Sequence, residues 1–414
     1  MKKTLLALTL ALSMTAPAFA QDFAMGEETK GLKVKISDDT DFSIRTRMQP
    51  RFDMGDLITS KDGKSYESET DMYLRRLRLE MDGKLTKELK YNLTLEMDKN
   101  GKSGSTSASA ANEVKVLYAY LDYKFADTAN LRFGKAKLPY SRISLTSSSK
   151  QLLIERPVST EAAKKLFDDY YQTNAMLHGS IAEGMISYNL ATADGWENKN
   201  IIKTGTSTST ADLTTGVVTT TSTDVKVQKS NPVFMGRVEV SPPGFVEKGK
   251  SDAHLGEGQH VTLGFSTASQ GSIEYTGASG DSESRTLMGV DISAHFGGLT
   301  LQGEYTAWKI DYSNAATSDK EPTGWYAQAG YFIPGINLEP VVRYEIYDHN
   351  SNAAAGADDT EEKDTTIGVN WYGKGHSFKI GANWVNSSYG KNASGYLADA
   401  AKKDVYQVQA QLYF

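Results

Sequence analysis

The stretch VYQVQAQLYF, residues 405–414, ends the chain and decides the fold class. In a β-strand, successive side chains point to opposite sides, so residues two apart share a face. One face of this segment is apolar and ends in phenylalanine, while the other carries Gln407, Gln409 and Gln411. The segment therefore predicts a strand with lipid on one side and water on the other, although a strand of a soluble sheet can also end in this way.

Segments of the same kind recur along the chain, each close to the roughly 9–11 residues that a membrane-spanning strand needs. We count about sixteen of them, and an even number lets one chain close with both ends on the same side. The last one resembles the C-terminal strand that outer-membrane barrels present to their assembly machinery. We therefore predict an all-β fold, a transmembrane antiparallel β-barrel. The segments begin near Phe42, Met72, Lys90, Val114, Leu131, Gln172, Met185, Val233, Gln259, Arg285, Leu299, Gly324, Leu338, Asp364, Ser377 and Val405.

The links between these segments alternate in length. Short links lie at 83–88, 126–130, 180–184, 297–298, 334–337 and 373–376. The exception on that side is 241–258, which contains a Pro-Pro-Gly break. The alternate links are long and polar, as at 55–71, 139–171, 194–231 and 350–362. Short periplasmic turns and long external loops are the pattern of outer-membrane barrels.

The N-terminal end predicts export. Residues 1–20 combine two lysines, an apolar stretch and a small-x-small exit, which indicates a cleaved signal peptide. The apolar stretch is shorter than the roughly 20 residues that a membrane helix needs. We expect residues 21–41 to form a periplasmic lead-in segment without a clear strand, and residues 42–414 to form the outer-membrane β-barrel of a Gram-negative bacterium.

Composition agrees with this class and excludes others. Removing Lys2 and Lys3 from 45 basic residues leaves 43 against 51 acidic ones, a net charge of −8 in place of −6. An acidic chain disfavours nucleic acid as a partner. Cysteine is absent, which excludes disulfides and thiolate metal sites. Tyrosine and glycine are abundant, at 22 and 36 residues, while mean hydropathy is only −0.44, as expected of strands that are half lipid-facing.

Arginines line up on one face of the first two segments. Arg45, Arg47 and Arg51 share a face in the first, and Arg76 and Arg78 share one in the second. An arginine facing lipid at mid-membrane costs about 2–4 kcal/mol, so five of them would rival the stability of a whole domain, about 5–15 kcal/mol. They must therefore line the lumen as a basic wall. The neighbouring arginine at position 75 is out of phase, and we expect it at the rim or paired across the wall.

Two consequences of the basic wall stay open. Guanidinium groups remain charged and offer forked donors, which suits oxyanions such as phosphate, sulfate or carboxylate. A ring of them would favour anions. Alternatively, an opposing acidic wall would turn the arginines into one side of a transverse field, with weak or no selectivity. The candidates for that opposing wall are Glu80, Glu96, Asp98 and Glu304, with Glu345 as a further one.

Two long stretches carry a family resemblance. LRFGKAKLPYSRISLTSSSKQLLIERP at 131–157 and GWYAQAGYFIPGINLEPVVRYEIYD at 324–348 resemble the phosphate-selective porin O and P family. The resemblance extends more loosely from about residue 42 to the C-terminus. It implies a sixteen-stranded barrel, usually a trimer, whose third external loop folds into the pore. By position that loop is 139–169, and its basic and acidic residues nearly balance. This departs from the strongly basic funnel of a phosphate specialist.

Four basic residues near this loop are candidates for the constriction: Lys137, Arg142, Lys150 and Arg156. Lys135 and Lys137 fall on the parity that should face lipid. Either a bulge at Gly134 turns them inward, as glycine in a strand often does, or they lie at the outer rim and reach toward lipopolysaccharide phosphates. The family motif, with a lysine shortly before the proline and aromatic residues, favours Lys137 near the constriction.

Enzyme chemistry has little support. His178 and Ser180 share a strand face, but no orienting acid or oxyanion donor is evident. The other histidines are scattered, so we expect no catalytic residue, no metal and no cofactor. We predict a homotrimeric porin in contact with outer-membrane lipid and lipopolysaccharide, passing small hydrophilic solutes with a modest preference for anions. The alternatives are a non-selective or oligosaccharide-type porin, or a surface adhesin or structural barrel with a plugged lumen.

Overall fold

The structure is a computed structural model, and it describes most of the chain. The described residues are 31–59, 66–102, 113–196, 208–211, 218–221, 227–247, 249–275, 282–314, 317–352, 360–390 and 402–414. The predicted signal peptide at 1–20 and the first part of the lead-in segment lie outside them.

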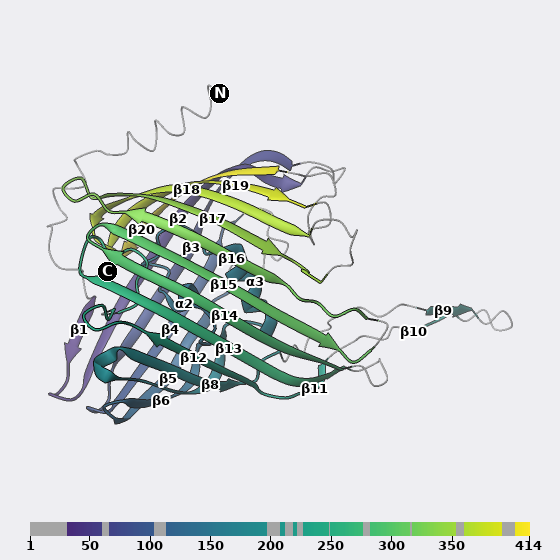
Figure 1. The fold of residues 1–414 in the computed structure, drawn as a ribbon, viewed down its shortest axis with the longest axis horizontal. Coiled ribbons are helices and arrows are strands. Elements are labelled where there is room, and N and C mark those ends of the chain that lie inside the picture. Colours follow the sequence, from purple (N-terminus) through teal and green to yellow (C-terminus); the bar gives the residue numbers. More distant parts are fainter. Residues whose placement is uncertain are drawn as a thin grey trace.

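The chain forms a closed antiparallel barrel (Figure 1). Its main sheet has 18 strands, and setting aside the short β1 and β11 leaves 16, as predicted. Each strand pairs with its neighbours in the barrel, and β2 pairs with β20 to close it. The barrel strands are β2 (Asp41–Thr59), β3 (Tyr66–Lys84), β4 (Leu89–Asn100), β5 (Lys115–Ala126), β6 (Ala129–Lys137), β7 (Tyr171–Ile181), β8 (Ile186–Ala193), β12 (Val233–Val240), β13 (Gln259–Tyr275), β14 (Ser282–Phe296), β15 (Leu299–Tyr312), β16 (Thr323–Tyr331), β17 (Leu338–Asp348), β18 (Glu361–Lys374), β19 (Phe378–Tyr389) and β20 (Lys402–Tyr413).

Short strands extend this framework. β1 (Leu32–Lys35) pairs with the start of β2, so the lead-in segment contains a strand that its sequence did not indicate. β11 (Val227–Ser230) pairs with the end of β13. β9 (Thr208–Ala211) and β10 (Val218–Thr221) form a separate hairpin. The short connections and the C-terminus lie at one end of the barrel, here called the short-turn end, and the long loops lie at the other.

The alternation of side chains makes the outer surface apolar. On β13 and β14, polar or small residues such as Ser266 and Ser293 are fully buried on the inner face. Phe265 and Val290 pair across the two strands and are 44% and 45% exposed on the outer face. A continuous belt of exposed Leu, Ile, Val and Phe would be unstable in water, so it indicates contact with lipid. Among the described residues, the helices are all too short or too polar to cross a membrane.

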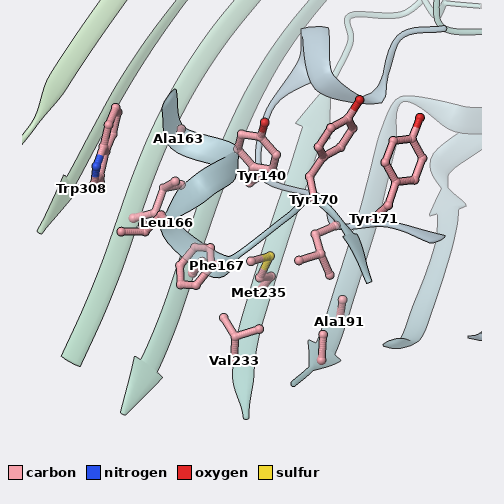
Figure 2. Close-up of a cluster of buried hydrophobic side chains, with 14 of the residues drawn as sticks. Tyr140, Ala163, Leu166, Phe167, Tyr170, Tyr171, Ala191, Val233, Met235 and Trp308 are labelled. Carbon is pink, nitrogen blue, oxygen red and sulfur yellow. The ribbon is translucent and has the colours of Figure 1, made fainter. Parts of the chain in front are cut away.

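The third long loop, here called L3, connects β6 to β7 and folds into the barrel, as the family resemblance implied. It contains α2 (Arg142–Leu145), α3 (Val158–Ala163) and the 3₁₀ helix η3 (Lys164–Phe167). Leu166 and Phe167 pack against Met235 and other inward apolar side chains of the wall (Figure 2). This apolar contact inside a polar lumen is the anchor of L3 and explains why the wall is apolar at that level.

The exceptional link at 241–258 also folds inward, from the short-turn end. The backbone N–H groups of Asp252 and Ala253 donate to the carbonyl of Lys150 in L3, at 3.1 and 3.0 Å. Arg142 of L3 donates two hydrogen bonds to the carboxylate of Glu247, at 2.9 and 2.8 Å. Two segments that enter the barrel from opposite ends therefore meet inside it.

Candidate functional site

L3 crosses the lumen and is hydrogen-bonded to the wall on several sides. The Oγ of Ser141 donates to Glu304 on β15 at 2.8 Å, and Arg343 on β17 donates to the carbonyl of Glu155 at 3.0 Å. On the other side, Lys379 on β19 donates to the carbonyl of Gln151 at 2.9 Å. These contacts fix L3 across the channel, so its side chains and the wall facing them form the candidate constriction.

The predicted basic wall lies on the lumen side of β2 and β3, under L3. Arg47, Arg51, Arg76 and Arg78 are each less than a tenth exposed, while Arg45 pairs with Asp82 nearer the short-turn end. Arg75 also points inward, because the register between β2 and β3 shifts between Gln49 and Pro50 and leaves residue 75 as an extra one. Beyond this bulge the alternation of inward and outward side chains continues, shifted by one residue. Arg75 and Arg76 therefore both face the lumen, although they are adjacent in the sequence.

Glu155 of L3 joins three of these arginines. Its carboxylate accepts hydrogen bonds from Arg75 at 2.6 and 3.1 Å, forms an ion pair with Arg51, and lies 3.7 Å from Arg76. Burial alone would raise the pKa of Glu155, but the guanidinium groups of Arg75, Arg51 and Arg76 hold it well below its usual range. The carboxylate is therefore ionised at neutral pH and binds L3 to the basic wall.

A second group of positive charges, here called the cationic cluster, consists of Arg47, Arg78, Lys137 and Arg156. Arg47 and Arg78 donate to the Oγ of Ser148 at 3.0 and 3.3 Å. Lys137 and Arg156 both donate to the carbonyl of Thr146, at 3.2 and 3.1 Å. Lys137 also donates to the carbonyls at the end of α2, which favour a cation.

The structure thus places Lys137 inside the barrel, but the reason is not the bulge at Gly134 that the sequence suggested. The ladders on both sides of β6 are regular at Gly134, so no bulge turns the lysine. Instead, alternation stops at the end of the strand, where Ala136 and Lys137 are both buried. Gly134 has φ of +126°, and a Cβ there would lie 2.3 Å from the carbonyl oxygen of Ala119, so only glycine fits.

Three of the four expected members of the opposing acidic wall lie elsewhere. Glu80 pairs with Arg47, Glu96 with Arg78, and Asp98 with Arg75. The physical reason is that Glu80 lies on β3 itself and that β4, which carries Glu96 and Asp98, is the direct neighbour of β3, so these acids alternate with the arginines on the same wall. Glu304 alone lies across the barrel, on β15, where it holds Ser141 and the N–H of Arg142.

The wall from β14 to β18 is nevertheless acidic, and its β14 and β15 part lies across the barrel from the arginines. Inward carboxylates gather on β14, β15, β17 and β18, and each is less than a tenth exposed. Glu345, weighed from the sequence, is among them and accepts from Arg343 at 2.9 Å. The other carboxylates could have been found from the sequence, because they occupy the alternate positions of these strands that face the lumen. The members of this acidic arc are Asp291, Glu304, Glu339, Glu345, Glu362 and Asp364.

The remaining expected residues of L3 have distinct roles. Arg142 is fully buried in its pair with Glu247; burial alone would lower its pKa, but the carboxylate raises the pKa above its usual value. Lys150 lines a cavity of about 1020 Å³ at the short-turn end, together with residues of the 241–258 segment and residues 373–376. The two residues thus face the short-turn end of the constriction.

Comparison with known proteins identifies the class of barrel. The pattern of the family described as phosphate-selective porin O and P matches residues 44–414. The chain belongs to this family. It is 36% identical over 413 residues to a protein of Aquifex aeolicus described only as uncharacterized, covering 94% of this chain and 91% of that one. It is 23% identical over 438 residues to Porin O of Pseudomonas aeruginosa, covering 92% of each.

Solved structures agree on the fold of this porin. An anion-selective porin from Comamonas acidovorans superimposes with a TM-score of 0.60 at 13% identity, covering 91% of this chain and all of that one. Family and fold together indicate a channel in the outer membrane of a Gram-negative bacterium rather than an enzyme. His178, considered with Ser180 for catalysis, lies 3.0 Å from the carboxylate of Asp122, which also pairs with Arg132.

Proposed function

We propose that this porin passes small hydrophilic solutes by diffusion and modestly prefers anions, oxyanions such as phosphate among them. The observation that supports the preference is the cationic cluster. Arg47 and Arg78 each contact a carboxylate, and Arg156 lies 4.0 Å from Glu161. Lys137 contacts backbone carbonyls and, within the described part of the chain, no carboxylate. By formal count the cluster therefore has four basic side chains against three carboxylates.

The cluster would act through its field rather than by contact. Arg47 and Arg78 are largely covered by L3, so a passing solute does not bind them directly. A charge in a narrow, low-dielectric wall is screened less than one on an open surface, so it still changes the local concentration of ions. This predicts modest selectivity rather than a specific phosphate site.

A second candidate is a porin with weak or no selectivity, favoured by the acidic arc. The arginines lie on β2 and β3, while Asp291 and Glu304 lie across the barrel on β14 and β15, and the other carboxylates of the arc lie between these positions, on β17 and β18. Such a transverse field orients dipolar solutes and water without excluding either sign of ion. The oligosaccharide-type porin and the plugged adhesin or structural barrel are further outcomes of the same measurements.

We also propose the orientation and the assembly. The short-turn end faces the periplasm and the long loops face outward, in contact with lipopolysaccharide, because outer-membrane barrels are inserted this way. The family resemblance supports a homotrimer. Cross-linking of the purified protein in detergent should give a trimer, and a monomer alone would reject this assembly.

Planar-bilayer recording tests the proposed function. In a potassium chloride gradient, the reversal potential should have the sign of a moderate chloride preference, and Lys137→Met should reduce that preference. The control is Lys124→Met, because Lys124, near the short-turn end of β5, is 48% exposed and pairs with Asp127 of the following turn. Clear potassium preference would reject the anion proposal and leave the porin, while a channel without conductance would favour the plugged barrel. Faster sugar than phosphate flux in liposomes would favour the oligosaccharide type.

A further inference from the structure

Three histidines that are far apart in the sequence meet at the short-turn end. His254 lies on the inward segment 241–258, His260 is the second residue of β13 and His295 the last but one of β14. The ring centroid of His254 is 4.6 Å from that of His260 and 4.5 Å from that of His295. Glu247 joins them, since one ligand atom each of Glu247, His254 and His260 lie within 4.8 Å of one another.

Two nitrogens of this group are buried without a hydrogen-bond partner. They are the Nε2 atoms of His254 and His295. An unsatisfied buried polar atom costs about 1–3 kcal/mol, so native structures rarely leave two of them side by side. Nε2 of His254 points toward Glu247, whose nearest oxygen is 3.7 Å away, too far for a hydrogen bond. An ion between His254, His260 and the Glu247 carboxylate would give the Nε2 atom of His254 a partner.

The other nitrogens of the two strand histidines are already oriented. His260 Nε2 lies 2.9 Å from the Oγ of Ser293, and His295 Nδ1 lies 3.3 Å from the Oγ1 of Thr300. Hydroxyl partners of this kind fix the orientation of an imidazole ring and leave its second nitrogen available, as around metal-binding histidines. His254, His260 and Glu247 also line the 1020 Å³ cavity, which gives an ion a route to the site.

We propose that Glu247, His254 and His260 bind a divalent transition-metal ion such as Zn²⁺, with His295 as a further nitrogen ligand. Imidazole nitrogens with one carboxylate suit zinc and its neighbours, and not Mg²⁺ or Ca²⁺, which prefer oxygen ligands. Ligand atoms of a tetrahedral zinc site lie about 3.3 Å apart for bonds of about 2.0 Å, so binding draws the side chains together by about an ångström or more. From the sequence we expected no metal site, and this proposal departs from that expectation.

The site would tie the inward segment to the barrel. Its ligands come from that segment and from two wall strands, and Glu247 also holds Arg142 of L3. A bound ion would share the Glu247 carboxylate with this arginine. Metal binding would therefore stabilise the contact between the inward segment and L3, at the periplasmic side of the constriction.

Zinc titration of the folded mature porin, made without a histidine tag and kept in detergent, tests the proposal. Zinc competition with a chromophoric chelator should show one ion per chain, and His254→Gln and His260→Gln should each weaken binding at least about tenfold. His178→Gln is the matched control, because His178 lies on β7 and pairs with Asp122 outside the cluster. It should bind zinc as the parent does.

Heat-dependent migration on a gel verifies that each variant folds. If His260→Gln fails to fold, His254→Gln decides, because its side chain belongs to a turn rather than to a barrel strand. Absence of stoichiometric zinc binding by the parent, or equal binding by the folded His254→Gln variant, would overturn the proposal. The three rings would then be a neutral stacked cluster. Since binding is measured without conductance, the result is independent of the proposed transport function.

Discussion

Replacing Glu155 by glutamine separates the two tasks of the basic wall, which are to hold L3 and to set ion preference. The substitution keeps the size of the side chain and removes the negative charge that Arg51, Arg75 and Arg76 share. The cationic side of the constriction then gains one unit of positive charge. We expect a stronger preference for anions together with weaker anchoring of L3.

The size of the selectivity change follows from Coulomb's law. An ion about 8 Å from the lost charge, in a water-filled channel of dielectric constant about 80, changes its energy by about 0.5 kcal/mol. Screening at about 0.1 M salt, with a Debye length of about 10 Å, reduces this to about 0.2 kcal/mol. Anions gain and cations lose this amount, so the anion-to-cation permeability ratio should rise about twofold.

The stability change follows from the contacts. Removing one partner of a buried ion pair costs about 3–5 kcal/mol. The Glu155 side chain is 31% exposed, so we expect a loss near the lower limit, about 3 kcal/mol. Reversal potentials in a salt gradient measure the first effect and urea unfolding in lipid vesicles measures the second. Glu88→Gln is the control, because Glu88 is exposed in a short turn. An unchanged ratio, or a shift toward cations, would refute the assigned role of the basic wall.

Three further predictions concern anchoring, lipid contact and pH. Arg142→Ala should lower the free energy of unfolding by about 3–5 kcal/mol, because it leaves Glu247 without its buried partner, whereas Lys124→Ala should change it by less than about 1 kcal/mol; equal effects in urea unfolding would contradict this. Val290→Lys should cost about 2–4 kcal/mol in lipid vesicles, since Val290 faces lipid, and a neutral result would show that this face is in water. The stability deficit of Glu155→Gln should be constant above pH 4.5, the ordinary pKa of the group, and should shrink as the pH falls further, because the folded protein holds that pKa lower. A deficit that shrinks already between pH 7 and 5, measured by urea unfolding, would exclude this explanation.

The strands could be predicted because their signal is local. Every spanning segment must present apolar residues to lipid at every second position, so even a segment with several arginines, such as β3, keeps Leu77 and Leu79 on the outer face. Lead-in strand β1 has no such requirement, since it only extends the edge of β2, and its sequence gave no clear pattern.

The partners of the arginines could be predicted only in part. The short turn after β3 places Glu96 directly opposite Arg78 in the ladder, so setting the register of β3 and β4 would have paired them. The inward orientation of Arg75 could not be predicted, because it depends on a bulge in β3. The alternation of apolar and polar residues in the sequence does not show where that bulge lies. Glu155 and the histidine cluster depend on how L3 and segment 241–258 fold inward, and neither has a periodic pattern.

The seam between β2 and β20 has a consequence for chain order. The N–H of Phe414 donates to the carbonyl of Thr46 at 3.0 Å and the N–H of Thr46 donates back at 2.6 Å, so first and last strands form the same kind of ladder as any consecutive pair. The barrel wall is a closed ring of strands, so the position of the chain ends within this ring does not determine which strands are neighbours. A circularly permuted chain, with residues 41 and 414 linked and new ends at the 297–298 turn, would have the same neighbours around the ring, apart from the displaced terminal phenylalanine. Within this ring every strand is held on both sides, so unravelling must break two ladders at once.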